Sequence, residues 1–210
     1  MTSVQGYKGI PMKDIRGYME EEEVKKLIDA TASPRDKLLL RLLWVTGARI
    51  SEIVGDKSWY KNRVFYGLRV EDILWKESVV VLDTLKRKQY PPPKRRVTLD
   101  ARTLEMLKTY VVTNHLPKES KVFKITRQRA WQIVKELAKS VGIKKVGLKP
   151  PHPHHLRHSS CVAYIRHNNT MEGLRKLQQK LKHANIQTTA HYLQFAPEEQ
   201  EEVEDVFGKW

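Results

Sequence analysis

The segment SPRDKLLLRLLWVTG, residues 33–47, constrains the fold more than any other part of the sequence. Its residues 38–44 are apolar on most sides of a helix, so other elements must surround this helix. Ser33 before Pro34 is typical of an N-cap followed by the first helical position, and Gly47 is typical of a helix end. We therefore expect a central, buried helix.

The segments around this helix show two kinds of periodicity. Helical spacing of apolar residues runs over residues 18–32, 48–55, 100–112, 126–142, 154–168, 171–183, 186–195 and 197–210. Shorter segments rich in valine, leucine and aromatic residues predict strands at 63–75, 77–83 and 95–100. Prolines at 91–93 require a loop before the last strand, because proline cannot donate to a sheet ladder. The sequence thus predicts a mainly α fold with a small antiparallel β-sheet (α+β), inserted after the second or third helix.

The charge balance indicates the kind of partner. The chain has 39 lysines and arginines against 24 aspartates and glutamates, a formal net charge of +15. Such an excess attracts polyanions, and nucleic acid is the leading candidate; the alternative is a solvated basic surface.

Cysteine content and hydropathy indicate the compartment. The single cysteine, Cys161, excludes an intramolecular disulfide, and its apolar context favours a buried small residue over a nucleophile. The chain has neither the apolar run of a membrane span nor the apolar core of a signal peptide in its first residues. We expect a cytoplasmic protein, nucleoid-associated if prokaryotic, with no membrane partner.

The stretch PHPHHLRHSS, residues 151–160, is the first candidate for chemistry. Its histidines fit a metal site poorly, because no Cys, Asp or Glu stands nearby to complete the ligands. His154 and Arg157 are one helical turn apart and can hold one phosphate between them. A helix start with structural histidines is the alternative.

Two further stretches supply complementary groups. In TGARISEI, Arg49 follows a helix-ending glycine and can point into a cleft, with Glu52 holding its guanidinium; the alternative is a surface ion pair. In LKHANIQTTAHYLQF, His183 and Tyr192 are nine residues apart. A lone tyrosine on an amphipathic helix usually serves packing, so its meaning depends on the other two stretches.

Together these stretches closely resemble the tyrosine recombinases, also called phage-integrase-type recombinases. That family has an Arg in TG-x-R-x-S-E, a Lys in a β-hairpin, H-x-L-R-H, and L-G-H followed nine residues later by the nucleophilic Tyr. The matching residues are Thr46, Gly47, Arg49, Ser51, Glu52, His154, Leu156, Arg157, His158, Leu181, His183, Thr188, Thr189 and Tyr192. The resemblance runs from about residue 18 to about residue 201. It implies a catalytic domain at 18–196, an N-terminal arm at 1–17 and a C-terminal tail helix at 197–210.

The resemblance also implies a site-specific DNA recombinase or integrase that works through a 3′-phosphotyrosyl intermediate, with no metal or other cofactor. Arg49 and Arg157 would grip the non-bridging phosphate oxygens while Tyr192 attacks phosphorus. His154 is placed to take or hold the tyrosine proton. His183 would donate a hydrogen bond to the scissile phosphate.

The family's catalytic lysine, which would protonate the departing 5′ oxygen, has two candidates. Lys86 best matches the strand-end position, and Lys88 projects to the same side if the strand continues. Lys94 resembles instead the K-x-R of the return strand. A departure from the family pattern is Lys182, which stands where the family usually has a helix-ending glycine, so we expect a different local turn there.

Contacts to double-stranded DNA are expected at two places. Arg127, Gln128 and Arg129 begin a helix that can enter a major groove, because Arg and Gln make bidentate base contacts. The loop KRKQYPPPKRR carries cations of which we expect some to reach phosphate, namely Lys86, Arg87, Lys88, Lys94, Arg95 and Arg96.

The family resemblance implies a tetramer on paired DNA sites, and we expect a monomer or dimer in the free protein. The tail carries an apolar stripe (Val203, Val206, Phe207 and Trp210) that can dock on a neighbouring protomer or on its own domain. Alternative functions are a type IB topoisomerase-like DNA-relaxing enzyme and a non-catalytic DNA-binding module derived from a recombinase.

Overall fold

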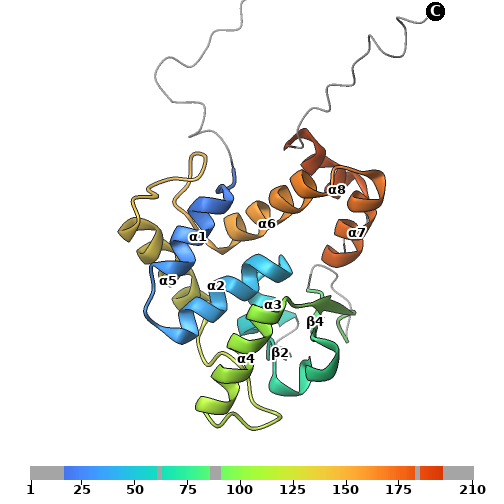
Figure 1. The fold of residues 1–210 in the computed structure, drawn as a ribbon. Helices are drawn as coiled ribbons and strands as arrows, with labels where there is room; N and C mark the ends of the chain where they lie inside the picture. Colours follow the sequence, from blue (N-terminus) through green and yellow to red (C-terminus); the bar gives the residue numbers. More distant parts are fainter. Residues whose placement is uncertain (1–16, 61–62, 86–90, 183–184, 196–210) are drawn as a thin grey trace, which may run out of the picture.

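A computed structural model describes residues 17–60, 63–85, 91–182 and 185–195, with only the backbone at 57–60 and 63–64. It is mainly helical with a small antiparallel β component, as the sequence predicts (Figure 1). The α-helices are α1 (Glu21–Asp29), α2 (Pro34–Thr46), α3 (Ile50–Val54), α4 (Ala101–Thr113), α5 (Arg127–Ser140), α6 (Pro153–His167), α7 (Met171–Leu181) and α8 (Gln187–Ala190). Short 3₁₀ turns are η2 (Val70–Asp72), η3 (Trp75–Glu77) and η4 (His191–Phe195).

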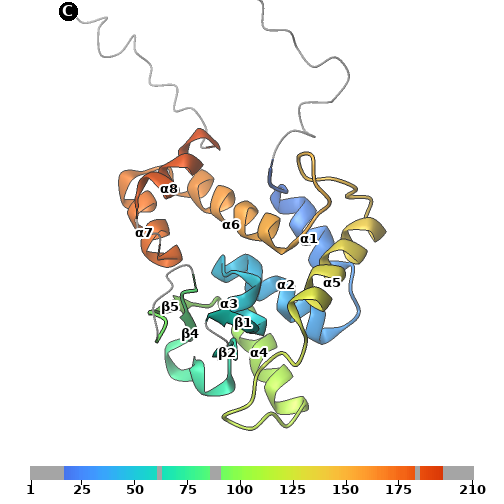
Figure 2. The ribbon, with the colours of Figure 1, turned by 180° about the vertical axis from the view of Figure 1, so that it is seen from behind.

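Helix α2 lies at the centre, as predicted, and packs against α1, α3, α4 and α6 (Figures 1 and 2). Ser33 caps its start by accepting a hydrogen bond from the backbone N–H of Asp36 at 3.3 Å. Gly47 ends it in the left-handed conformation, with φ of 58°. An added Cβ on Gly47 would lie 3.1 Å from a side-chain carbon of Leu181 in α7. The turn after α2 is therefore both left-handed and tightly covered.

The strands form two sheets rather than the single sheet predicted. Strands β1 (Asp56–Tyr60) and β2 (Arg63–Phe65) make an antiparallel pair. Strands β3 (Ile73–Leu74), β4 (Val79–Asp83) and β5 (Lys94–Thr98) make a second antiparallel sheet in that order. In β5, burial alternates along the strand, with Arg95 and Val97 inward and Arg96 outward. This alternation directs one arginine of the strand into the protein.

The buried side chains form two clusters. The larger cluster contains side chains of helices α1 through α5 and of the three-stranded sheet, packed around the leucines of α2. The smaller cluster joins α6, α7 and η4, and it contains Tyr18, Cys161, Leu177, Leu181 and Tyr192. Tyr192 thus packs in this smaller core, together with side chains of α6 and α7. Among the described helices, none combines the length and apolar composition needed to cross a bilayer.

Candidate active site

The turn between α2 and α3 positions Arg49. The Thr46 hydroxyl accepts a hydrogen bond from the N–H of Ala48 at 3.1 Å, which tightens this turn around Gly47. Arg49 is the N-cap of α3, and Glu52 holds it twice. The Arg49 backbone N–H donates to Oε2 of Glu52 at 3.0 Å, and its guanidinium donates to Oε1 at 3.1 Å. The Glu52 side chain is fully buried, so this is not the surface ion pair of the alternative interpretation.

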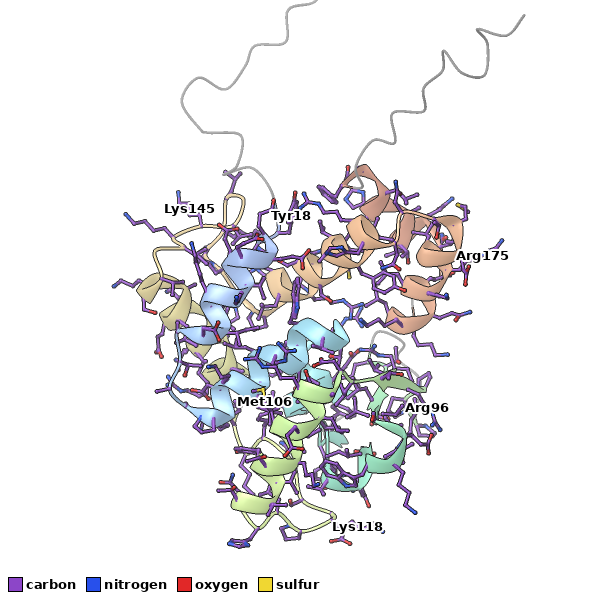
Figure 3. The ribbon with its side chains drawn as sticks, in the orientation of Figure 1. Tyr18, Arg96, Met106, Lys118, Lys145 and Arg175 are labelled. Atoms are coloured by element: carbon purple, nitrogen blue, oxygen red, sulfur yellow. The ribbon has the colours of Figure 1, made fainter. Side chains whose placement is uncertain are left out.

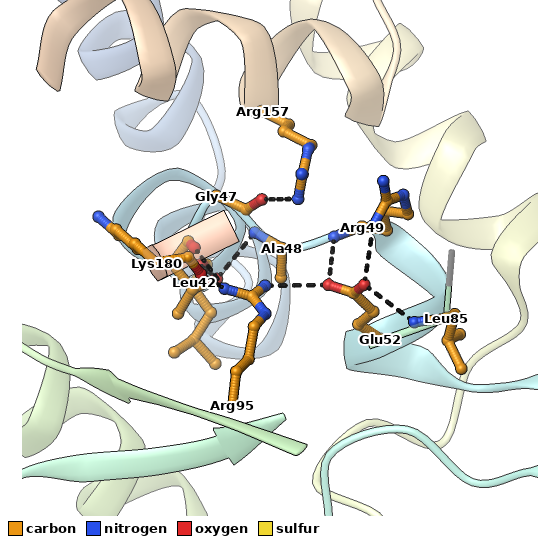
Figure 4. A network of polar contacts seen from close by, with 10 residues as sticks. Leu42, Gly47, Ala48, Arg49, Glu52, Leu85, Arg95, Arg157 and Lys180 are labelled. Carbon is orange, nitrogen blue, oxygen red and sulfur yellow. Dashed lines mark hydrogen bonds and ion pairs between the residues drawn. The ribbon is translucent and has the colours of Figure 1, made fainter. Parts of the chain in front are cut away.

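A second arginine, Arg95 of β5, binds the same carboxylate from the other side (Figure 4). Its guanidinium donates to Oε2 of Glu52 at 2.9 Å, and the side chain is only 1% exposed. It also donates to the backbone oxygen of Lys180 near the end of α7. The expectation that loop cations reach phosphate therefore does not hold for Arg95, because burial and internal partners occupy it.

Arg157 enters from α6. His152 caps this helix, accepting a hydrogen bond from the N–H of His154 at 3.2 Å, and Pro153 is its first residue. One turn later, Arg157 is buried and donates to the backbone oxygen of Gly47 (Figure 4). The motifs of α6 and of the α2–α3 turn are therefore in direct contact, although 110 residues separate these two positions.

The electrostatics of this group favour an anion. Burial opposes ionisation of Glu52, but the charges of Arg95, Arg157 and Arg49 outweigh it and lower the pKa of Glu52. Burial, followed by the charge of Arg49, lowers the pKa of the Arg157 guanidinium. The guanidiniums of these arginines lie close enough to repel one another around one ionised carboxylate. A phosphodiester would relieve that repulsion.

Histidines of α6 continue the site. Partial burial lowers the pKa of His154 to about 4, and the charges of His158 and Arg157 act in the same direction. The rings of His154 and His158 meet edge to face with centroids 4.4 Å apart. His155 points elsewhere, is buried, and stacks on His152 at 3.8 Å. Among the described residues, no group of three or more His, Cys, Asp or Glu is arranged to hold a metal ion.

Tyr192 lies in η4 with its ring buried in the smaller core. Its hydroxyl is hydrogen-bonded to Nδ1 of His158 at 2.9 Å, and the buried Cys161 lies in the same core. Burial, aided by Cys161, raises the pKa of Tyr192, while the charges of Arg157 and Arg49 oppose that rise. The side chain that contacts the hydroxyl is therefore His158, whereas the sequence favours His154.

Three of the expected site residues, Lys86, Lys88 and His183, lie outside the described residues. The described residues beside them are Leu85 and Lys182. The backbone N–H of Leu85 donates to Oε1 of Glu52 at 3.4 Å. Lys182 ends α7 with φ of 51° and ψ of 41°, the left-handed conformation that glycine prefers. The turn expected to differ at Lys182 thus keeps the backbone of a glycine-type helix end.

Sequence reasoning missed Arg95, Cys161 and the contact of His158 with the tyrosine. For Arg95 a signal was available, because Arg95, Val97 and Leu99 alternate on one face of a strand, and an arginine among apolar residues indicates a buried partner. Neither of the other two had a signal: both contacts depend on how α6 faces η4.

The helix proposed to read DNA begins where predicted. Thr126 caps α5 by accepting a hydrogen bond from the N–H of Arg129 at 3.1 Å, and Arg127, Gln128 and Arg129 are exposed. Arg127 pairs with Asp56 of β1, and Arg129 pairs with Glu136 at 3.2 Å. A groove of about 1150 Å³ runs between α3, the end of β2 and this face of α5. The three side chains are accessible, but two of them are held by acidic partners.

Arginines that converge beside a tyrosine in a mainly helical domain agree with the class to which the motifs are similar, the tyrosine recombinases. The model of the phage integrase family matches residues 17–199, and the chain belongs to that family. Tyrosine recombinase XerD of Bifidobacterium longum is 29% identical over 201 residues, covering 84% of this chain and 58% of that protein. Tyrosine recombinase XerA of Pyrococcus horikoshii is 28% identical over 189 residues, covering 86% of this chain and 57% of that protein. The chain thus spans less than two thirds of these relatives.

Solved structures share the fold. A crystal structure of XerA recombinase superposes with a TM-score of 0.67 at 22% identity, covering 89% of this chain and 61% of that one. The XerH recombinase bound to its difH substrate, in a pre-cleavage complex, gives a TM-score of 0.65 at 20% identity. The match covers 85% of this chain and 50% of that one. The catalytic domain of bacteriophage HP1 integrase gives 0.60 at 18% identity, covering 91% of this chain and 95% of that domain.

Proposed function

We propose that this chain carries the catalytic centre of a site-specific recombinase that cleaves and rejoins double-stranded DNA through Tyr192. The carrying observation is the contact of Arg157 with the Gly47 oxygen, which brings two distant motifs together beside a buried tyrosine. Family membership supports the same reaction class. Relatives named tyrosine recombinases support it further.

The arginines act on the phosphate. Arg49 is partly exposed and Arg157 lies beside it, so a phosphodiester can bridge the two guanidiniums through its non-bridging oxygens. Charge on those oxygens grows as the pentavalent transition state forms. Guanidiniums fixed by Glu52 and by the Gly47 oxygen need little reorganisation to stabilise it. His154 and His183 are proposed to donate hydrogen bonds to the same phosphate.

Tyr192 is the proposed nucleophile, and His158 is the proposed acceptor of its proton. Burial lowers the pKa of His158, so its ring is neutral near pH 7 and Nδ1 can accept from the hydroxyl 2.9 Å away. The tyrosine oxygen attacks phosphorus while the bond from phosphorus to the 5′ oxygen breaks. Lys86, or Lys88, donates a proton to that oxygen. The products are a 3′-phosphotyrosyl link and a free 5′ hydroxyl, and attack by another 5′ hydroxyl reverses the step.

Trapping on DNA tests this proposal. A duplex nicked near the cleavage site loses a short fragment after attack, so the covalent adduct accumulates. An adduct at Tyr192 excludes a non-catalytic DNA-binding module. Transfer of a strand between two duplexes excludes an enzyme that only relaxes DNA, as a type IB topoisomerase does. Failure to form any adduct on DNA carrying the correct site would refute the proposed activity.

The proposed assembly is a tetramer on paired sites, formed from monomers or dimers. XerH and lambda integrase have been solved bound to DNA, the latter as a dimer on a core site, which supports DNA as the partner. Deletion of 198–210, which lie outside the described residues, should leave single-site binding intact and impair two-site assembly. Loss of folding on deletion would favour docking of the tail on its own domain. Activity on DNA is consistent with a cytoplasmic, nucleoid-associated protein if the source is prokaryotic.

A further inference from the structure

Arg95 differs from the other basic residues of its hairpin. Its neighbour Arg96 projects from the edge of the sheet, with 59% of the side chain exposed (Figure 3). Arg95 is 2% exposed and faces the α2–α3 turn. Burying a guanidinium requires partners for its charge and its donors, since an uncompensated buried charge is strongly destabilising. The partners of Arg95 therefore indicate what the residue does.

Those partners come from three separate elements (Figure 4). The guanidinium donates to the Glu52 carboxylate of α3 at 2.9 Å, to the Thr46 oxygen at the end of α2 at 3.5 Å, and to the Lys180 oxygen of α7. One planar group thus joins the sheet to the helices that carry the other motifs. Because the guanidinium is rigid and planar, its hydrogen bonds restrict how these elements shift relative to one another.

Glu52 extends the connection to the loop of the proposed general acid. Its Oε2 binds both Arg95 and the backbone N–H of Arg49. Its Oε1 binds both the Arg49 guanidinium and the N–H of Leu85, the residue before Lys86. Each carboxylate oxygen is shared, so a rotation of the Glu52 carboxylate would shift Arg49 and Leu85 together. Arg49 belongs to the proposed arginine clamp (Arg49 and Arg157), and the general-acid loop begins after Leu85. Arg95 and the Lys180 oxygen limit that rotation.

We propose that Arg95 is a positioning residue that, through Glu52, holds the start of the general-acid loop in register with the arginine clamp. This inference rests on the proposed function, because it concerns proton donation to the 5′ oxygen. Arg95 is buried and held by partners within the protein. Its effect is geometric, and misplacement of a reacting group by about 1 Å can reduce a rate about a hundredfold.

A substrate that needs no proton donor separates this role from general support of the fold. Replacing the scissile 5′ oxygen by sulfur gives a thiolate leaving group, which departs without protonation. Arg95→Met should cleave ordinary nicked DNA slower by on the order of tenfold to a hundredfold. On the sulfur substrate its rate should come within about threefold of the unsubstituted protein, because the proton donor no longer contributes.

Two variants complete the experiment. Arg95→Lys keeps the charge opposite Glu52 but lacks the planar guanidinium. Its loss of cleavage rate on ordinary DNA should therefore be smaller, and it should also disappear on the sulfur substrate. It carries the test if Arg95→Met does not fold. Arg175→Met removes the same charge from the outer face of α7, where Arg175 projects away from the site (Figure 3), and should leave both rates unchanged.

The outcomes are distinguishable. If Arg95→Met lowers the cleavage rate equally on the oxygen and the sulfur substrate, Arg95 supports the fold in general and the proposal is overturned. Normal cleavage of ordinary DNA by Arg95→Met would also overturn it. Absence of any adduct with the unsubstituted protein on both substrates would instead refute the proposed function, and the positioning role with it.

Discussion

The hydroxyl of Tyr192 lies 2.9 Å from Nδ1 of His158 while the tyrosine ring is buried in the smaller core. A phenol in such a place resists ionisation, and its pKa is raised, chiefly by burial. The nearby charges of Arg157 and Arg49 act in the opposite direction. The resting tyrosine is therefore protonated, and His158, the proposed acceptor of its proton, is already in contact with it.

Tyr192→Phe should abolish covalent attachment to DNA and leave binding almost unchanged. The ring keeps its packing against the smaller core, and only the hydroxyl, the proposed nucleophile, is removed. Denaturing electrophoresis of nicked-duplex reactions measures the adduct, and a gel shift on the same DNA measures binding. A denaturant-resistant adduct with the Phe variant would mean that another residue is the nucleophile.

His158→Ala should slow cleavage near pH 7 by on the order of a hundredfold, as expected for loss of a proton acceptor. Burial and the charge of Arg157 lower the pKa of His158, so the unsubstituted protein should lose activity only as pH falls below the usual histidine range. The variant should recover with rising pH, because hydroxide can take the tyrosine proton. His154→Ala serves as the comparison, and recovery in that variant alone would transfer the role to His154.

Arg49→Ala and Arg157→Ala should each lower the cleavage rate by on the order of a hundredfold or more, as for loss of a transition-state charge donor. Affinity for long duplex should change little, because the chain has many other cations. Single-turnover cleavage at saturating protein isolates the rate from binding. Normal cleavage by either variant would remove that arginine from the site.

The parts of this site that sequence reasoning reached are those with local signatures. Ser33 and Gly47 mark the two ends of α2 because capping depends on a few neighbouring residues, and both do so in the structure. The contact of Glu52 with Arg49 follows from three-residue spacing at a helix start. Such relationships are visible in the sequence because they arise within one turn of the chain.

The parts that sequence reasoning did not reach depend on packing between distant elements. Arg95 meets the Lys180 oxygen across 85 residues, and His158 meets Tyr192 across 34. The sequence patterns pointed elsewhere: some of six cations in a basic loop, Arg95 among them, were expected to reach phosphate, and the H-x-x-R pattern drew attention to His154. Which of two histidines one turn apart reaches η4 is decided by how α6 and η4 pack.

His155 should make the protein less stable as pH falls. Burial lowers its pKa from 6.5 to about 3, with the charges of His152 and His158 acting in the same direction. Between these values the unfolded chain binds the proton and the folded protein does not, so stability decreases as pH drops through this window. The effect should amount to a few kcal/mol at most.

His155→Phe keeps a ring against His152 and should reduce the slope of unfolding free energy against pH, measured by urea titration. His115→Asn, at an exposed site, should leave that slope unchanged, and an unchanged slope in His155→Phe would contradict the assignment.

Lys182→Gly should stabilise the protein. Lys182 ends α7 with φ of 51°, in a region where a side chain costs roughly 1 kcal/mol and glycine nothing. Glycine also makes the unfolded chain more flexible, which offsets part of the gain, so the net increase should be about 0.5 kcal/mol. Lys176→Gly is the matched control: it makes the same exchange inside α7, where it should destabilise by about 1 kcal/mol. Urea unfolding of the two variants should therefore move the midpoint in opposite directions. If Lys182→Gly lowers the midpoint as Lys176→Gly does, the left-handed helix end at Lys182 is absent in solution.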